Sequence, residues 1–180
     1  MFLDFQEYFP KSYILRCKYL FKWSAKKSDV VLTVSEYSKN KIQKHFNIDK
    51  LFVTRNAVDP IYFDEYQKSD AQDYVKLNFG IQNFFLFVSR FEPRKNHISL
   101  LKVFVENKFY LKNELVFIGN EAHECKEFDN YYNNLTPEIK SKIKVLKRVN
   151  INDLLEFTRA ADISIFPSIA EGFGIPPLES

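Results

Sequence analysis

Short apolar strands alternate with helical segments along the second half of the chain. The predicted strands, each an apolar run too short for a helix of ordinary length, are residues 84–88, 114–118, 143–146 and 162–166. Helices are expected between them, at residues 97–107, 124–135 and 151–160. This alternation is typical of a parallel sheet with helices on both faces and right-handed crossovers. We therefore predict an α/β protein built on a doubly wound sheet.

The first part of the chain contains fewer strands. Helices are predicted at residues 10–27 and 36–46, and strands at residues 30–34 and 51–54. Ser35 directly precedes the second helix. We expect Ser35 to cap that helix, because a serine hydroxyl at this position accepts a hydrogen bond from an N–H group of the first turn.

A break in the pattern divides the chain into two domains. Residues 64–73 are polar and charged without a clear period, which indicates a linker. A short helix is expected directly after it, at residues 74–79. The predicted organisation is a first domain at residues 1–63, a linker at 64–73 and a second domain at 74–180.

The last predicted strand leads into residues 170–179, which read AEGFGIPPLE. Gly172 and Gly174 stand where the chain must turn, and two prolines follow where a helix would begin, a position that tolerates proline. Ligands of open parallel sheets bind at the carboxyl ends of strands, and helix N-termini offer N–H groups to anions. On spacing alone, an ordinary turn with two solvated glutamates is the slightly favoured interpretation.

A second loop occupies the same topological position after the strand at 84–88. It reads SRFEPRKNH and carries Arg90 and Lys95. Arginine offers a planar set of donors and lysine a compact charge, and both suit phosphate. Taken alone, this loop would be interpreted as a solvated basic turn.

Bulk properties exclude several functions. The net charge of +3 is too small to argue for a nucleic-acid partner. Only 4 glycines are present, with neither a Gly-x-Gly-x-x-Gly nor a phosphate-loop motif, which argues against dinucleotide oxidoreductases and phosphate-loop NTPases. The 2 cysteines and 3 histidines show no metal-ligand spacing, so no metal site is predicted.

The sequence also bears on localisation. Residues 1–7 carry acidic rather than basic side chains, and no apolar run approaches membrane-spanning length. We expect neither a signal peptide nor a transmembrane helix. Cys17 and Cys125 are far apart in the sequence, and we expect them to be free thiols in a reducing cytosol.

The helix at residues 10–27 contains six basic residues and no acidic one. Leu15, Tyr19 and Trp23 form a second apolar stripe among these basic residues. The favoured interpretation is a helix packed on two sides. The alternative is a basic, aromatic surface that contacts anionic lipid headgroups.

The stretch FPSIAEGFGIPPLE resembles the signature loop of glycosyltransferase family 4. These are retaining, nucleotide-sugar-dependent enzymes with two facing Rossmann-like domains, the GT-B fold. The family motif is two glutamates separated by seven residues, matched by Glu171 and Glu179. The segment SDVVLTVSEYSKNKIQKHF…LFVTRNAVDPIYF resembles the end of the family's N-terminal, acceptor-side domain, although Ala57 replaces the usual glycine.

The resemblance implies roles for both loops. In similar proteins the arginine and lysine matched by Arg90 and Lys95 bind the donor phosphates, usually without a metal. Cations there stabilise the charge that grows on the leaving pyrophosphate as the glycosidic bond breaks. Gly119 matches a position where the family's backbone approaches the nucleotide.

The signature loop has its own implied roles. Glu179 is matched to the residue that binds the ribose diol, and Glu171 to the one that faces the donor sugar and its reacting carbon. Backbone N–H groups are expected to bind sugar hydroxyls or phosphate at Phe173, Gly174 and Ile175. Arg90, Lys95 and Glu171 are therefore the predicted catalytic residues.

The predicted function is transfer of a hexose, with mannose weakly favoured by the EPRKN sequence, from a nucleotide diphosphate sugar. The acceptor would be a glycan or lipid-linked glycan of surface polysaccharide synthesis, at the inner face of the membrane. The resemblance covers nearly the whole chain, whereas the chain matches only the middle of a family member. Both domains are therefore expected to be incomplete, and the chain alone is not expected to turn over. The alternative is an inactive remnant or half-protein that binds nucleotide sugar or a partner chain.

Overall fold

The computed structural model describes residue 6 and residues 10–180, which form two compact units. The first unit contains Met1–Ala57 together with Ala170–Ile175, and the second contains Val58–Ile169 together with Pro176–Ser180. Most of residues 1–7, on which the absence of a basic leader was predicted, lie outside the described residues.

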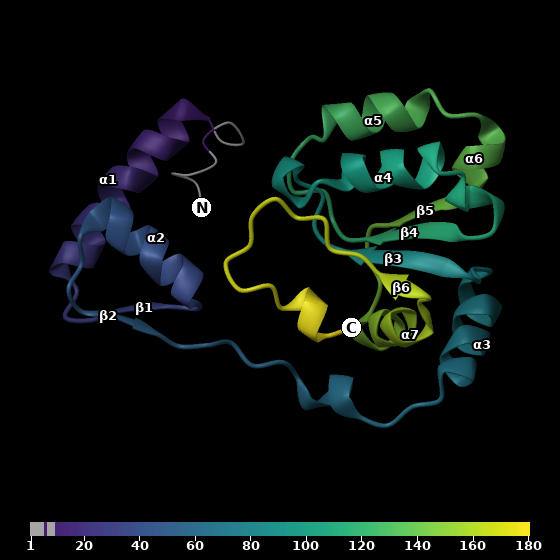
Figure 1. The fold of residues 1–180 in the computed structure, drawn as a ribbon, viewed down its shortest axis with the longest axis horizontal. Coiled ribbons are helices and arrows are strands. Elements are labelled where there is room, and N and C mark those ends of the chain that lie inside the picture. Colours follow the sequence, from purple (N-terminus) through teal and green to yellow (C-terminus); the bar gives the residue numbers. More distant parts are fainter. Residues whose placement is uncertain (1–5, 7–9) are drawn as a thin grey trace. The chain divides into compact units, whose positions relative to one another are not determined.

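The second unit is built on a four-stranded parallel sheet with strand order β5-β4-β3-β6 (Figure 1). Its strands are β3 (Phe84–Val88), β4 (Glu114–Ile118), β5 (Ile143–Leu146) and β6 (Ile163–Ser164). The first three have the predicted bounds. β6 is shorter than predicted: Ile165 donates to the carbonyl of Leu86 at 2.8 Å, and the next ladder donor would be residue 167, a proline without an N–H group.

Helices cover both faces of this sheet, as the α/β prediction requires (Figure 1). They are α3 (Lys68–Phe79), α4 (His97–Glu106), α5 (Lys126–Asn133), α6 (Pro137–Ser141) and α7 (Ile151–Ala160). Neighbouring side chains of β3 point to opposite faces. Leu86 belongs to an apolar cluster with α3 and α7, and Phe87 belongs to a second cluster with α4 and α5.

The predicted linker extends too far along the chain. Helix α3 begins at Lys68 rather than near Tyr74, so the second half of residues 64–73 is helical. Ala71 and Val75, one helical turn apart, are both buried and pack in the cluster that contains α7. Lys68 also donates from Nζ to the carbonyl of Ala161 at 2.8 Å. Ala71 and Val75 are the apolar residues of a mostly polar segment, so the sequence pattern did not indicate a helix there. Their packing against α7 shows that they form the buried face of α3.

The first unit contains α1 (Lys11–Lys27), β1 (Val31–Thr33), α2 (Glu36–Phe46) and β2 (Leu51–Val53). The two strands pair in parallel. Ser35 caps α2 as predicted, because its hydroxyl accepts a hydrogen bond from the N–H group of Ser38 at 3.1 Å.

Helix α1 is more exposed than the favoured interpretation requires. Cys17 is its one buried residue in the described part of the chain. The side chains of the second stripe are open to solvent, with exposed fractions of 72% for Leu15, 72% for Tyr19 and 58% for Trp23. The prediction that α1 is packed on two sides is therefore wrong for the described residues. Across those residues, we find no helix with the length and apolar character needed to cross a bilayer.

Candidate functional site

The carboxyl ends of β3 and β4 bring Ser89 and Gly119 into close backbone contact. Val88 and Ile118 are paired in register, Ser89 donates to the carbonyl of Ile118 at 2.9 Å, and Gly119 has a φ of 156°. A Cβ atom at position 119 would lie 2.0 Å from the carbonyl oxygen of Ser89. Only glycine fits here, so the two loops can meet at this edge of the sheet.

The loop that carries Arg90 and Lys95 is held from several sides. Arg94 forms an ion pair of 2.6 Å with Glu92, and both side chains are nearly buried, with 12% and 10% exposed. Asn96 adopts a left-handed conformation and donates to the carbonyl of Pro167 at 3.2 Å. Arg90 is exposed and Lys95 is half-buried. The loop therefore presents two cations on a fixed backbone, while Arg94 serves the structure of the loop itself.

Beneath this loop lies His97, which no sequence motif singled out. Its ring is 2% exposed and stacks on Phe91 with ring centroids 4.1 Å apart. Burial lowers the pKa of His97 to about 4; the backbone of Ser89 opposes this shift, and the positive charge of Lys95 adds to it. Neither ring nitrogen has a hydrogen-bond partner among the described residues. The neutral ring is thus a packing element that supports the loop.

Glu179 directly follows the short 3-10 turn Pro176–Leu178, where the sequence predicted the start of a helix. Its side chain is half-buried, and burial raises the pKa of Glu179. Burial also raises the pKa of Tyr62, with added contributions from the negative charges of Glu179 and Asp59. Tyr62, which the sequence argument did not name, is therefore a near neighbour of this carboxylate.

The signature loop residues Ala170–Ile175 group with the first unit, although they were predicted to belong to the second domain. Within that unit, the carbonyl of Gly172 accepts hydrogen bonds from the hydroxyls of Ser35 and Ser38, at 2.5 and 3.1 Å. Gly174 has a φ of 86° and requires glycine, whereas a Cβ atom at Gly172 would meet nothing closer than 3.8 Å.

The predicted site residues therefore fall into two groups. Arg90, Lys95, Gly119 and Glu179 belong to the second unit. The remainder belong to the first unit and are half-buried: Glu171, Phe173, Gly174 and Ile175. The searched residues, 6 and 10–180, contain no group of three or more His, Cys, Asp or Glu side chains arranged to hold a metal ion.

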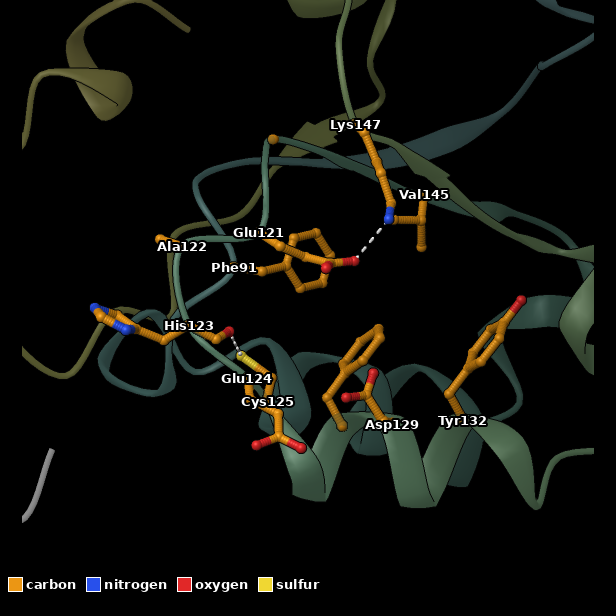
Figure 2. Close-up of a pocket in the computed structure, with 12 residues that line it drawn as sticks. Phe91, Glu121, Ala122, His123, Glu124, Cys125, Asp129, Tyr132, Val145 and Lys147 are labelled. Carbon is orange, nitrogen blue, oxygen red and sulfur yellow. Dashed lines mark hydrogen bonds and ion pairs between the residues drawn. The ribbon is translucent and has the colours of Figure 1, made fainter.

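A cavity of about 430 Å³ lies beside Gly119, between the loop that follows β4, helix α5 and the end of β5 (Figure 2). Figure 2 shows Glu121 and Lys147, which form an ion pair of 2.8 Å, on one side and Asp129 of α5 on the other. Burial, together with the negative charges of Asp129, Glu92 and Glu121, raises the pKa of Cys125, which lines the cavity, to about 11. The negative charges around this cavity disfavour the binding of an anion such as phosphate.

The chain is similar in sequence to O-antigen chain mannosyltransferases. The chain is 32% identical over 179 residues to the O-antigen chain mannosyltransferase RfbU of Salmonella typhimurium. This alignment covers 96% of this chain and 46% of RfbU. It is 27% identical over 178 residues to O-antigen chain mannosyltransferase B of Escherichia coli, covering 97% and 46%. The chain thus spans about half the length of these curated relatives.

Solved structures show the same fold. The structure of Anabaena HepE in complex with UDP and glucose matches with a TM-score of 0.67 and 20% identity, over 97% of this chain and 47% of that one. The predicted GT-B fold is confirmed. A sequence profile of the glycosyl transferases group 1 family matches residues 69–180, from α3 through the signature loop. The chain belongs to the glycosyl transferases group 1 family.

Proposed function

We propose that the chain binds a nucleotide diphosphate sugar and takes part in retaining transfer of its hexose. The observation that carries this proposal is the pair of cations, Arg90 and Lys95, on a loop fixed at the carboxyl end of β3. Arg90 offers a fork of N–H donors and Lys95 a compact charge, and together they suit a diphosphate.

The same two cations suit the chemistry of the leaving group. Negative charge on the diphosphate grows as the glycosidic bond breaks, so fixed cations stabilise the transition state more than the bound donor. Two cations on one loop can do this without a metal, and we propose transfer with no metal cofactor. The ion pair of Arg94 with Glu92 keeps the loop from rearranging as the charge moves.

The remaining contacts to the donor are proposed from the family motif. Glu179 accepts hydrogen bonds from the ribose diol, for which its two carboxylate oxygens are suited. Gly119 allows the backbone to approach the nucleotide. Glu171 faces the donor sugar and its reacting carbon. The backbone N–H groups of Phe173, Gly174 and Ile175 bind sugar hydroxyls or phosphate.

The sugar and the setting are proposed from the relatives and from α1. Two O-antigen chain mannosyltransferases are among the relatives, which supports mannose as the hexose and a glycan or lipid-linked glycan as the acceptor. Such an acceptor would lie at the cytoplasmic face of a membrane. Helix α1 carries exposed Leu15, Tyr19 and Trp23 among its basic residues, and we propose that it contacts anionic lipid there.

A non-catalytic role in nucleotide-sugar binding is the second candidate. The chain covers 46% of RfbU, so the acceptor contacts of the relatives need not all be present in the described residues. Both candidates require donor binding and differ in turnover. Release of nucleoside diphosphate from GDP-mannose or a UDP-sugar in the presence of glycan acceptors, lost in Glu171→Ala, supports the enzyme.

Donor binding is tested by calorimetric titration of UDP and GDP into the wild type, Arg90→Ala and Lys95→Ala. Loss of one charged phosphate contact is expected to cost about 1.5–3 kcal/mol, which weakens binding by roughly 10- to 150-fold. Lys126→Ala is the matched control, because Lys126 is a 76%-exposed cation on α5 of the same unit. Equal affinities of wild type, Arg90→Ala and Lys95→Ala would refute the assignment of these cations.

A further inference from the structure

Two serine hydroxyls converge on one carbonyl of the signature loop. Ser35 Oγ donates to the carbonyl oxygen of Gly172 at 2.5 Å, and Ser38 Oγ donates to the same oxygen at 3.1 Å. A carbonyl oxygen has two lone pairs, so both of its acceptor positions are filled. The two serines are 137 and 134 residues away from Gly172 in the chain, yet all three belong to the first unit.

The hydroxyl of Ser35 has two separate tasks. Its oxygen accepts the N–H group of Ser38 and thereby caps α2, and its proton is donated to Gly172. Serine and threonine can do both with one atom, whereas an ionised aspartate is an excellent cap that has no proton to donate. Ser38 has no capping task for its side chain, so its hydroxyl serves the loop alone.

Fixing this carbonyl also fixes the next N–H group. The peptide unit is planar and trans, so the carbonyl of Gly172 and the N–H group of Phe173 point in opposite directions. Two hydrogen bonds on the carbonyl therefore aim the Phe173 N–H group away from α2. Gly172 needs this restraint, because a glycine with no Cβ contact closer than 3.8 Å is otherwise free to rotate its peptide planes.

We propose that Ser35 and Ser38 are positioning residues that orient the Phe173 N–H group of the signature loop for its contact with the donor. The contact of the Phe173 N–H group with the donor rests on the proposed function, whereas the restraint of the loop by the two serines does not. The two serines act through the backbone and do not touch the reacting atoms. The restraint joins α2 of the first unit to the loop between Glu171 and Phe173, which is a link that no spacing in the sequence indicates.

Hydrogen exchange of the whole chain, followed by mass spectrometry, tests the restraint without any ligand. Ser38→Ala removes one hydrogen bond and is expected to raise exchange in residues 170–175 by about fivefold, in line with a typical bond. Ser38→Thr keeps the hydroxyl and should restore wild-type exchange. Ser35→Asp keeps the cap, so exchange in α2 stays unchanged while exchange in the loop rises. Unchanged loop exchange in both Ser38→Ala and Ser35→Asp would overturn the restraint.

Titration of GDP-mannose and UDP-glucose then tests the positioning role. The double variant Ser35→Asp/Ser38→Ala is expected to bind the nucleotide sugar that the wild type prefers about tenfold more weakly, and Ser35→Thr/Ser38→Thr should recover most of that loss. Higher loop exchange with unchanged affinity would overturn positioning and keep the restraint. If the wild type binds neither nucleotide sugar, the proposed function and the positioning role both fail, while the exchange data still decide the restraint.

Discussion

Substitution of Gly119 by alanine is the sharpest structural test of the edge where the donor is proposed to bind. A Cβ atom at position 119 would lie 2.0 Å from the carbonyl oxygen and 2.6 Å from the carbonyl carbon of Ser89, and 3.1 Å from the nitrogen of Arg90. All three are backbone atoms, which no rotamer change can move. Ordinary contact begins at 3.4 Å, so the Ser89 carbonyl must retreat by about 1.4 Å, the difference between 3.4 and 2.0 Å.

The expected cost follows from that displacement. Overpacking typically destabilises a protein by about 1–3 kcal/mol, and displacement of backbone rather than side chain places Gly119→Ala at the upper end, at about 3 kcal/mol. The retreat also moves the backbone of Arg90. We therefore expect the affinity for UDP or GDP to fall in Gly119→Ala together with the free energy of unfolding.

Two other glycines of the same chain are matched controls. Gly80 has a φ of 68° and no atom near its Cβ position, so Gly80→Ala carries only the conformational cost of a left-handed alanine, about 1–2 kcal/mol. Gly172→Ala is expected to stay within about 0.5 kcal/mol of the wild type, because its nearest neighbours are 3.8 Å away.

Urea unfolding followed by far-ultraviolet circular dichroism measures all three variants. Fluorescence is unsuitable for the second unit, because the single tryptophan, Trp23, lies in the first. The expected order of stability is Gly172→Ala, then Gly80→Ala, then Gly119→Ala. A Gly119→Ala protein as stable as the wild type would refute the close contact between the two loops.

Two further predictions concern His97 and α1. The pKa of His97 is about 4 in the folded protein and 6.5 ordinarily, so the unfolded chain binds the extra proton more readily. The contribution of the neutral ring to the free energy of unfolding is therefore complete above pH 6.5 and falls by about 3 kcal/mol as the pH drops toward 4. His97→Phe should flatten this part of a pH series of urea midpoints, and the exposed His123→Gln should not; equal slopes in all three proteins would contradict the buried neutral ring. The fluorescence of Trp23 should shift on addition of anionic vesicles, because exposed apolar side chains among basic ones suit anionic lipid. The shift should become smaller as salt is added and should be absent in the Leu15→Glu/Tyr19→Glu variant. An equal response to neutral vesicles would argue against an electrostatic contact.

The sequence by itself determined the elements whose signal is local. The bounds of β3, β4, β5, α2 and α7 agree with prediction, because a short run of apolar residues or an apolar face at helical spacing is a property of neighbouring residues. The cap at Ser35 was likewise readable, since it needs only a serine and the turn that follows. The signature loop was sufficient to identify the family, because its residues stand together in the chain.

Tertiary contacts decided the features that join distant residues. The start of α3 at Lys68 depends on burial of Ala71 and Val75 in the cluster that contains α7, more than 75 residues further along. The ion pair of Arg94 with Glu92 is nearly buried, and this burial depends on the residues packed around the loop rather than on the loop's own composition.

The site shows the same division. The family resemblance pointed to Arg90, Lys95 and Glu179, because the motifs that carry it are made of residues close together in the chain. The need for glycine at position 119 arises only when the Ser89 carbonyl approaches within 2.0 Å of its Cβ position. The attachment of Gly172 to Ser35 spans 137 residues, and a hydrogen bond of this kind exists only once the fold has brought its donor and acceptor together.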